Sequence, residues 1–251
     1  RTPFGSFGQS LSSVSATDLG AAALSAALKA ARLPPEAIEE VFMGNVCSAN
    51  VGQAPARQAA LGASIPFSVP ATTINKVCAS GMKSIMLGAQ SIALGQAEFI
   101  AAGGMENMSQ IPYYAPQQRW GSKYGDALLI DGLAKDGLRD AFEQVPMGVL
   151  ADRVAAAQKI SREAQDDYAL ASYDRAEKAW AEGSFSEEVN PIEVQERKAK
   201  RTITQDEEYP KVIVEKVRGL KPAFSPDGSI TAANASTLND GACALILASE
   251  K

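Results

Sequence analysis

The sequence contains no histidine among its 251 residues, and this absence restricts its chemistry more than any other feature of its composition. Without an imidazole, these residues alone cannot supply a Cys–His or Ser–His pair, a histidine metal ligand or a histidine proton shuttle. Neither a GxGxxG nor a GxxxxGK[ST] pattern occurs, which argues against a dinucleotide-binding domain and against a P-loop. Any reaction must therefore use other side chains, or groups that lie outside these residues.

Cysteines and long apolar runs are also scarce. The three cysteines, Cys47, Cys78 and Cys243, are too few and too widely spaced for a disulfide framework or a zinc site, so a reducing compartment is expected. No apolar run reaches the roughly 18 residues of a transmembrane helix, and no membrane partner is predicted. With 29 acidic and 24 basic residues the net charge is −5, which argues against a nucleic-acid-binding surface.

Charge density divides the chain into three stretches. Residues 1–114 carry 12 charged side chains, residues 115–222 carry 37 and residues 223–251 carry 4. The first and last stretches are therefore predicted to share one buried core, with the middle stretch as a solvated insertion between them. The chain has no initiator Met and ends three residues after the apolar run 244–248, so we expect it to be part of a longer protein.

Strand and helix patterns alternate in the first stretch. Strands are predicted at 40–43, 71–77 and 99–102, and helices at 18–32 (capped near Thr17), 54–61 and 79–94. The last helix carries one apolar face, formed by Met82, Ile85, Met86, Ala89, Ile92 and Ala93. This alternation predicts an α/β fold with a mixed, mostly parallel sheet and helices on both faces.

The charged middle stretch predicts a different organisation. A long helix is expected from Arg162 to about Glu182, with Ser161 as its N-cap and Gly183 at its end. Short charged strands and turns are expected over residues 190–221. The middle stretch is therefore predicted to be an inserted α+β unit rather than a second large core, and a further core strand is predicted near 244–248.

Cys78 is the position where the sequence context indicates reactivity. It lies between a predicted strand and a predicted helix, where unpaired backbone N–H groups and the positive end of the helix dipole favour a thiolate. This strand–turn–helix placement is also that of a nucleophile elbow. The alternative is a buried structural cysteine, and for Cys47 and Cys243 that packing role is favoured.

Two polar motifs could border a ligand. Gly103 and Gly104 follow a buried strand and would allow close approach of the backbone. The stretches 234–236 (Asn-Ala-Ser) and 239–242 (Asn-Asp-Gly-Ala) are the second motif. A tight turn is the alternative for both.

Taken together, these motifs resemble the thiolase family, in order and over essentially the whole chain. The resemblance rests on residues 75–81 (Asn-Lys-Val-Cys-Ala-Ser-Gly), 103–106 (Gly-Gly-Met-Glu) and 232–242, with 1–3 (Arg-Thr-Pro) and 44–46 (Gly-Asn-Val) in agreement. Residues 52–58 and 206–209 favour the short-chain, acetoacetyl-CoA branch. The resemblance implies a thiolase N-terminal core at 1–114 and 223–251, with 115–222 as a loop domain that covers coenzyme A.

The resemblance also implies a reaction between two acetyl-CoA molecules that gives acetoacetyl-CoA and CoA, and that is reversible. Cys78 would attack an acyl-CoA thioester and hold the acyl group as a covalent intermediate. A second acetyl-CoA, deprotonated at its α-carbon, would then attack that intermediate. The backbone N–H of Cys78 is a suitable donor to the developing oxyanion.

Further site residues follow from the resemblance alone. The positions expected to contact coenzyme A are Tyr173, Lys211, Val212, Ile213, Lys216 and Ser236. The two lysines suit phosphate groups, although a solvated basic pair is the alternative. Some relatives bind potassium, and the matching ligands here are the Tyr173 hydroxyl and the backbone carbonyls of Ala232, Ala233 and Ala235.

The chain departs from the family pattern in its extent. The second thiolase half, with its Gly-His-Pro and Cys-x-Gly-Gly-Gly motifs, is absent, as is the strand that normally precedes Arg-Thr-Pro. That half supplies the histidine and the second cysteine of the reaction, so we expect these 251 residues alone to be inactive. Pro146 stands where many relatives have histidine, and residues 151–153 (Ala-Asp-Arg) also differ from the usual pattern.

Two alternatives stay open at this point. One is a truncated, non-enzymatic thiolase fragment, and the other is a thiolase specific for longer-chain 3-ketoacyl-CoA. The resemblance also implies a homo-oligomer, either a tetramer or a dimer. A cytoplasmic location is expected, with a mitochondrial one as the alternative.

Overall fold

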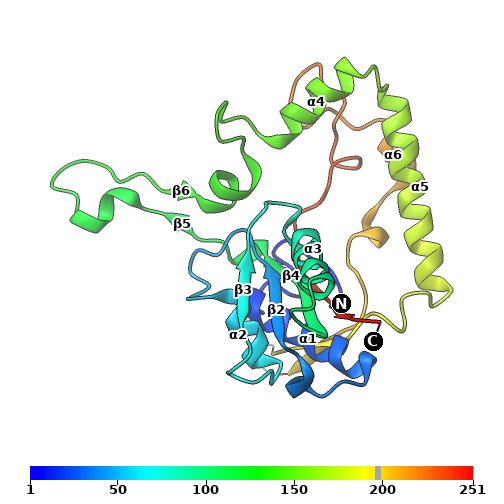
Figure 1. Ribbon diagram of the computed structural model, residues 1–251. Coiled ribbons are helices and arrows are strands. Elements are labelled where there is room, and N and C mark those ends of the chain that lie inside the picture. Colours follow the sequence, from blue (N-terminus) through cyan, green and yellow to red (C-terminus); the bar gives the residue numbers. More distant parts are fainter. Residues whose placement is uncertain (196–198, 251) are drawn as a thin grey trace.

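The structure, a computed structural model, describes residues 1–195 and 199–250 (Figure 1). Its centre is a five-stranded sheet in the order β1-β9-β4-β2-β3. The strands span Gly5–Ser6 (β1), Glu40–Gly44 (β2), Ala71–Ile74 (β3), Phe99–Asn107 (β4) and Asn239–Ala248 (β9). Strands β2, β3 and β4 are parallel to one another, and β9 is antiparallel to both β4 and β1. The sheet is mixed, as predicted.

The pairing of β4 with β9 joins the two ends of the chain. The ladder runs from Phe99 opposite Ala248 to Asn107 opposite Asp240, which is the whole length of β4. Residues from the first and last stretches of low charge therefore lie in one sheet. The exact domain boundaries at residues 114 and 222 stay a prediction.

One face of the sheet is covered by α1 (Ala16–Ala31) and α2 (Pro55–Gly62). Because strand side chains alternate between faces, Val41, Met43 and Ala101 point toward these helices and join the largest apolar cluster. The cap of α1 differs from the prediction: Ser15, not Thr17, accepts the N–H of Asp18. Ser15 has the extended backbone that an N-cap needs, and the helix begins one residue later.

The other face is covered by α3 (Ser80–Ala93), so helices lie on both faces, as predicted. The predicted apolar face of this helix meets the sheet only in part, because Ile92 packs against the cluster around Phe42 and Ile100 but the two methionines do not. Met82 and Met86 are 67% and 49% exposed, whereas Ser84 is fully buried against the sheet. Small residues face the strands because the helix lies so close to them: a Cβ on Gly88 would come within 2.7 Å of Leu247 Cδ1.

The chain between β4 and β9 leaves the sheet. In Figure 1 the β5–β6 pair projects away from the sheet layers, and α4, α5 and α6 form an arch beside them. The helix α5 starts after Ser161, whose side chain caps it, and ends just before Gly183, as predicted. Elements of this region are η2 (Met108–Gln110), β5 (Tyr113–Tyr114), η3 (Pro116–Trp120), β6 (Ile130–Asp131), η4 (Leu133–Leu138), α4 (Met147–Ala157), α5 (Arg162–Ala181), β7 (Ile192–Gln195), β8 (Lys200–Ile203), η5 (Tyr209–Lys211) and α6 (Val214–Val217); η1 (Pro35–Ala37) precedes β2.

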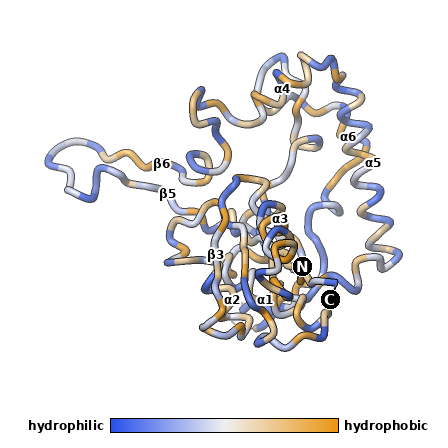
Figure 2. The backbone as a smooth tube through the Cα atoms, viewed as in Figure 1, coloured by the Kyte–Doolittle hydropathy of each residue, from blue (hydrophilic) through white to orange (hydrophobic). Residues whose placement is uncertain are grey.

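The inserted region is polar and is tied to the sheet by the first residue of the chain. Figure 2 shows hydrophobic residues gathered around the sheet and many hydrophilic ones along α5. The Arg1 guanidinium pairs with Asp206 at 2.8 Å and with Glu188 at 2.6 Å. These ion pairs connect the sheet edge near β1 to the segment before β7, at Glu188, and to the segment after β8, at Asp206. Across the described residues, no helix is both long and apolar enough to cross a membrane.

Candidate active site

Cys78 lies in a short turn between β3 and α3, and it is exposed. The turn is closed by backbone hydrogen bonds from Ala79 N to the Lys76 carbonyl (3.2 Å) and from Ser80 N to the Val77 carbonyl (3.0 Å). The thiol therefore stands two residues before the first helical residue, where the helix leaves N–H groups without intrahelical partners. The sequence predicted this placement.

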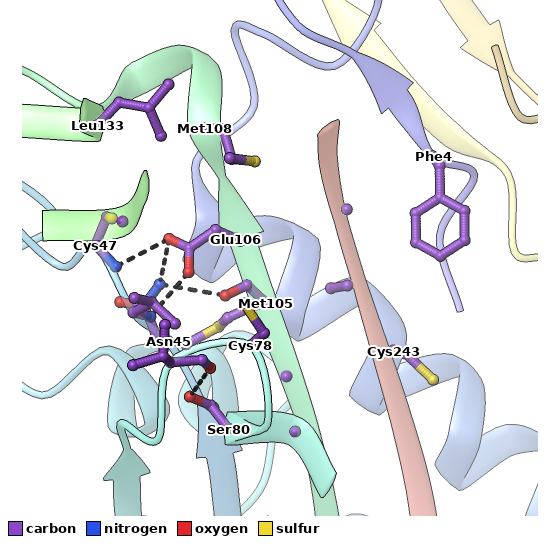
Figure 3. A pocket seen from close by; sticks show the side chains of 18 of the residues that line it. Phe4, Asn45, Cys47, Cys78, Ser80, Met105, Glu106, Met108, Leu133 and Cys243 are labelled. Carbon is purple, nitrogen blue, oxygen red and sulfur yellow. Dashed lines mark hydrogen bonds between the residues drawn. The ribbon is translucent and has the colours of Figure 1, made fainter. Parts of the chain in front are cut away.

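A cavity of about 350 Å³ opens beside this turn (Figure 3). Its lining includes all three cysteines, Glu106 and the apolar side chains of Phe4, Met108 and Leu133. Glycines let α3 lie directly on the strands there, because a Cβ on Gly44 would come within 2.8 Å of the Gly81 nitrogen. The cavity thus brings an exposed thiol to a largely apolar space at the ends of β2 and β4.

Glu106 is a half-buried carboxylate in this cavity, and no role was assigned to it from the sequence. It accepts hydrogen bonds from the N–H groups of Val46 (2.8 Å) and Cys47 (3.3 Å) and from Asn45 Nδ2 (3.0 Å), as Figure 3 shows. Burial raises the pKa of Glu106, and these hydrogen bonds lower it in part. Only the folded chain brings residues 45–47 and 106 together, so the sequence carried no direct signal for this contact.

The other two cysteines of the cavity lie in different environments. Cys47 is buried, as expected, and burial together with the charges of Glu106 and Asp136 raises its pKa to about 11. Cys243 is exposed, which corrects the expectation of a packed core cysteine. It lies on the β9 face that α3 only partly covers. Cys47 is therefore protected from deprotonation, whereas Cys243 is accessible.

The residues expected to contact coenzyme A gather in a second region. Tyr173, Lys211, Val212, Ile213 and Lys216 line one cavity of about 240 Å³, together with Ala232 and Ala233. Ser236 and Ala235 line a neighbouring cavity of about 340 Å³, which shares Lys211 and Ala232. The structure thus brings all nine predicted positions together, although α5, η5 and the 232–236 segment lie far apart in sequence.

Glu208 lies between these two cavities and was not singled out from the sequence. Burial raises the pKa of the Tyr173 hydroxyl, and the nearby Glu208 carboxylate raises it further. Glu208 also accepts a hydrogen bond from Lys211 at 3.4 Å. An acidic side chain at this point adds negative charge to a region otherwise rich in lysine and backbone oxygen.

The backbone oxygens expected to bind potassium belong to the 232–236 segment, and two of these alanines line the same cavity as Tyr173. Among the bonds between described residues, none is accepted by the carbonyl oxygens of Ala232, Ala233 or Ala235. Oxygen atoms of this kind, with a Tyr hydroxyl, suit a hard monovalent cation. The described chain holds no group of three or more Cys, Asp or Glu side chains arranged to bind a metal. The donor set therefore fits potassium rather than a transition metal.

Fold and site together define an α/β protein that presents an exposed cysteine between a strand and a helix, beside a cavity. Residues 1–251 match the thiolase N-terminal domain over their whole length. The protein belongs to the thiolase family.

Curated relatives and a solved structure agree with this assignment. The cytosolic and mitochondrial acetyl-CoA acetyltransferases of Gibberella zeae are each 50% identical to the chain, match 100% of it, and are covered over 63% and 59% of their own length. A thiolase from Ascaris suum, solved in complex with coenzyme A, superposes with a TM-score of 0.91 at 47% identity, covering 99% of this chain and 64% of that one. The chain therefore spans less than two thirds of these relatives.

Proposed function

We propose that these residues are the N-terminal and loop portions of an acetyl-CoA acetyltransferase, which joins two acetyl-CoA molecules into acetoacetyl-CoA and CoA. The carrying observation is the exposed Cys78 at the mouth of α3, facing a cavity of about 350 Å³. The relatives named as acetyl-CoA acetyltransferases support the reaction. The reaction is reversible, so the same site would cleave acetoacetyl-CoA with free CoA.

The chemistry proceeds in two transfers at one sulfur. The Cys78 thiolate attacks the thioester carbonyl, a new S–C bond forms, and CoA leaves as its thiolate. A second acetyl-CoA loses an α-proton to a base, and the resulting carbanion attacks the acyl-cysteine carbonyl. The Cys78 thiolate then leaves, and acetoacetyl-CoA is released. The backbone N–H of Cys78, at the mouth of α3, would stabilise the oxyanion that forms in each addition.

These residues do not provide the base that removes the α-proton of the second acetyl-CoA. The sequence has no histidine, and Glu106 is the one carboxylate in the described lining of the cavity, where it is already held by three donors. We therefore infer that this 251-residue chain by itself has little or no turnover, and that activity requires the rest of a thiolase.

Coenzyme A is proposed to lie against the second region. Tyr173, Val212 and Ile213 offer apolar contact, Lys211 and Lys216 offer positive charge to phosphates, and Ser236 offers a hydroxyl. Potassium would be held by the Tyr173 hydroxyl and the three alanine carbonyls, with Glu208 supplying negative charge nearby. When bound, the ion would order the 232–236 turn that borders the coenzyme.

The partners are proposed to be acyl-CoA and further copies of the same chain, as a tetramer or dimer. Exposed aromatic side chains on the β5–β6 arm, Trp120 at 91% and Tyr124 at 100%, support self-association. Relatives named as cytosolic and as mitochondrial support either location equally, and a cytoplasmic one is proposed.

The test labels the acyl intermediate. The complete protein is incubated with acetyl-CoA labelled in its acetyl group, quenched in acid and digested. We expect the label on the peptide that contains Cys78, and loss of both label and turnover in Cys78→Ser. Cys243→Ser is the matched control, since it removes an exposed thiol of the same cavity and should keep both.

Other outcomes of the labelling and turnover measurements would favour other assignments. Label on a different peptide would overturn the assignment of Cys78. Faster turnover of a long-chain 3-ketoacyl-CoA than of acetoacetyl-CoA would favour the longer-chain alternative. No label and no turnover in the complete protein would favour a non-enzymatic fragment.

A further inference from the structure

Val77, the residue directly before Cys78, has an unusual backbone conformation. Its φ angle is +48°, in the left-handed region. Six other non-glycine residues in the described chain have positive φ, and none of them is β-branched. For a β-branched side chain this region is sterically unfavourable, so surrounding contacts must hold it there. Cys78 is therefore carried on a strained backbone.

Two side chains hold Val77 in place. The Val77 N–H donates to Asn75 Oδ1 at 3.0 Å, and the Val77 carbonyl accepts from the Ser80 hydroxyl at 2.5 Å. The Asn75 contact spans two residues, which is the geometry of an Asx-turn. Both polar groups of the strained residue are therefore fixed by side chains of the same turn.

Asn75 is itself attached to a neighbouring loop. Its Nδ2 donates to the Val46 carbonyl at 3.2 Å. The Val46 N–H in turn donates to Glu106, the half-buried carboxylate at the end of β4 (Figure 3). One path of hydrogen bonds thus crosses three adjacent strand ends, from Glu106 on β4, through the loop after β2, to the turn after β3.

We infer that Asn75 is a positioning residue for the nucleophile: it holds Val77 in the left-handed conformation and so keeps the Cys78 thiol at the mouth of α3. The Asn75 side chain is exposed and contributes nothing to the apolar core. Its two hydrogen bonds are what it supplies. Without them, Val77 relaxes toward negative φ, and the peptide that follows it rotates, which moves Cys78. The inference rests on the proposed role of Cys78.

The experiment measures thiol reactivity, which needs neither acyl-CoA nor a complete active site. The purified complete protein is treated with iodoacetamide, and alkylation is followed by peptide-level mass spectrometry, so that each cysteine reports separately. We expect Asn75→Ala to slow alkylation of Cys78 by about tenfold, the scale of the strain released. Cys243, exposed and distant from the turn in sequence, is the internal control and should keep its rate.

A rescue variant separates positioning from general loss of structure. Glycine adopts positive φ without steric cost, so Val77→Gly in the Asn75→Ala background should restore most of the Cys78 rate. A conservative variant, Asn75→Ser, keeps a hydroxyl that can accept the Val77 N–H more weakly, and should give an intermediate rate. If Asn75→Ala does not fold, the same rescue is scored from Asn75→Ser.

The alkylation rates distinguish failure of the Asn75 inference from failure of the proposed role of Cys78. Unchanged Cys78 alkylation in Asn75→Ala, or a slow rate that Val77→Gly does not restore, would overturn the inference. Alkylation of Cys78 no faster than that of Cys243 in the parent chain would instead count against Cys78 as the nucleophile. Fast parent alkylation that depends on Asn75 and returns with glycine supports both.

Discussion

The two faces of the five-stranded sheet are packed differently. The face under α1 and α2 holds large, fully buried side chains, among them Leu19, Leu24 and Met43. The face under α3 has a small cluster around Phe42 and Ile100. The helix packs Leu87 and Ile92 against it and also turns the small residues Ser84 and Gly88 toward the sheet. The first face excludes water from a large apolar area. The second face lets α3 lie close to the strands.

This difference explains where the site lies. A helix that has glycine and serine among its sheet-facing residues can bring its first turn close to the strand ends, and the thiol lies directly before that turn. The same thin packing leaves Cys243 and Leu245 exposed on β9. We therefore expect substitutions under α1 to affect stability, and substitutions under α3 to affect the position of Cys78.

The largest expected loss of stability follows a substitution on the face covered by α1 and α2. Leu24→Ala removes a side chain that is 0% exposed and leaves a cavity among neighbours that cannot fully collapse. We expect the free energy of unfolding to fall by about 2–5 kcal/mol, measured by urea denaturation of the chain.

The matched variant lies on α3. Met86 is 49% exposed, so Met86→Ala should cost less than about 1 kcal/mol by the same measurement. Equal losses for the two variants would show that the faces contribute alike, and the comparison would then be wrong.

A smaller effect on stability is expected at the contact between β2 and α3. In Gly44→Ala the new methyl group would lie 2.8 Å from the Ser80 carbonyl carbon and the Gly81 nitrogen, so the first turn of α3 must move. We expect a loss of about 1–3 kcal/mol in unfolding free energy, together with slower alkylation of Cys78.

Gly81→Ala is the control for this contact. Its Cβ would meet no atom closer than 3.7 Å, and alanine favours a helix over glycine by roughly 1 kcal/mol. This variant should keep or raise stability and leave Cys78 alkylation unchanged. A fast thiol in Gly44→Ala would show that the helix position does not govern the nucleophile.

Local patterns in the sequence predicted much of this arrangement. The strand–turn–helix around Cys78, the long helix α5 with its Ser161 cap, and helices on both faces of a mixed sheet all follow from short-range signals. The sheet-facing side of α3 followed only in part, with Ile92 on it, because periodicity reports which residues are apolar and not which side of the helix meets the sheet. There the close approach selected Ser84 and Gly88 over Met82 and Met86.

The contacts between distant segments could not be predicted from one sequence. Glu106 and the 45–47 loop are joined only when β2 and β4 pair, and Asn75 reaches Val46 only once β3 lies beside β2. No spacing in the chain encodes those pairs. The resemblance to thiolases located the motif that contains Glu106 but gave no role to its carboxylate.

The smallest expected effect is a difference in how the unfolding free energy depends on pH at two carboxylates, Glu106 at the end of β4 and Glu39 before β2. Burial raises the pKa of Glu106 above its ordinary value of 4.5, so the folded state holds its proton more tightly than the unfolded chain. Its contribution to stability therefore decreases as pH rises from 4.5 through the raised pKa, and then levels off. Glu39, before β2, is exposed and accepts the N–H groups of Glu98 and Phe99, which lower its pKa.

Glu39 contributes with the opposite sign, since its stabilisation is present above the ordinary pKa and is lost as pH falls through the lowered one. We expect the unfolding free energy of the parent minus that of Glu106→Gln to decrease with rising pH, and the same difference for Glu39→Gln to increase. Urea denaturation of the three proteins at several pH values between about 3 and 7 measures both slopes. Parallel slopes would contradict the contrast, and a rising slope for Glu106→Gln would mean that its three hydrogen bonds outweigh its burial.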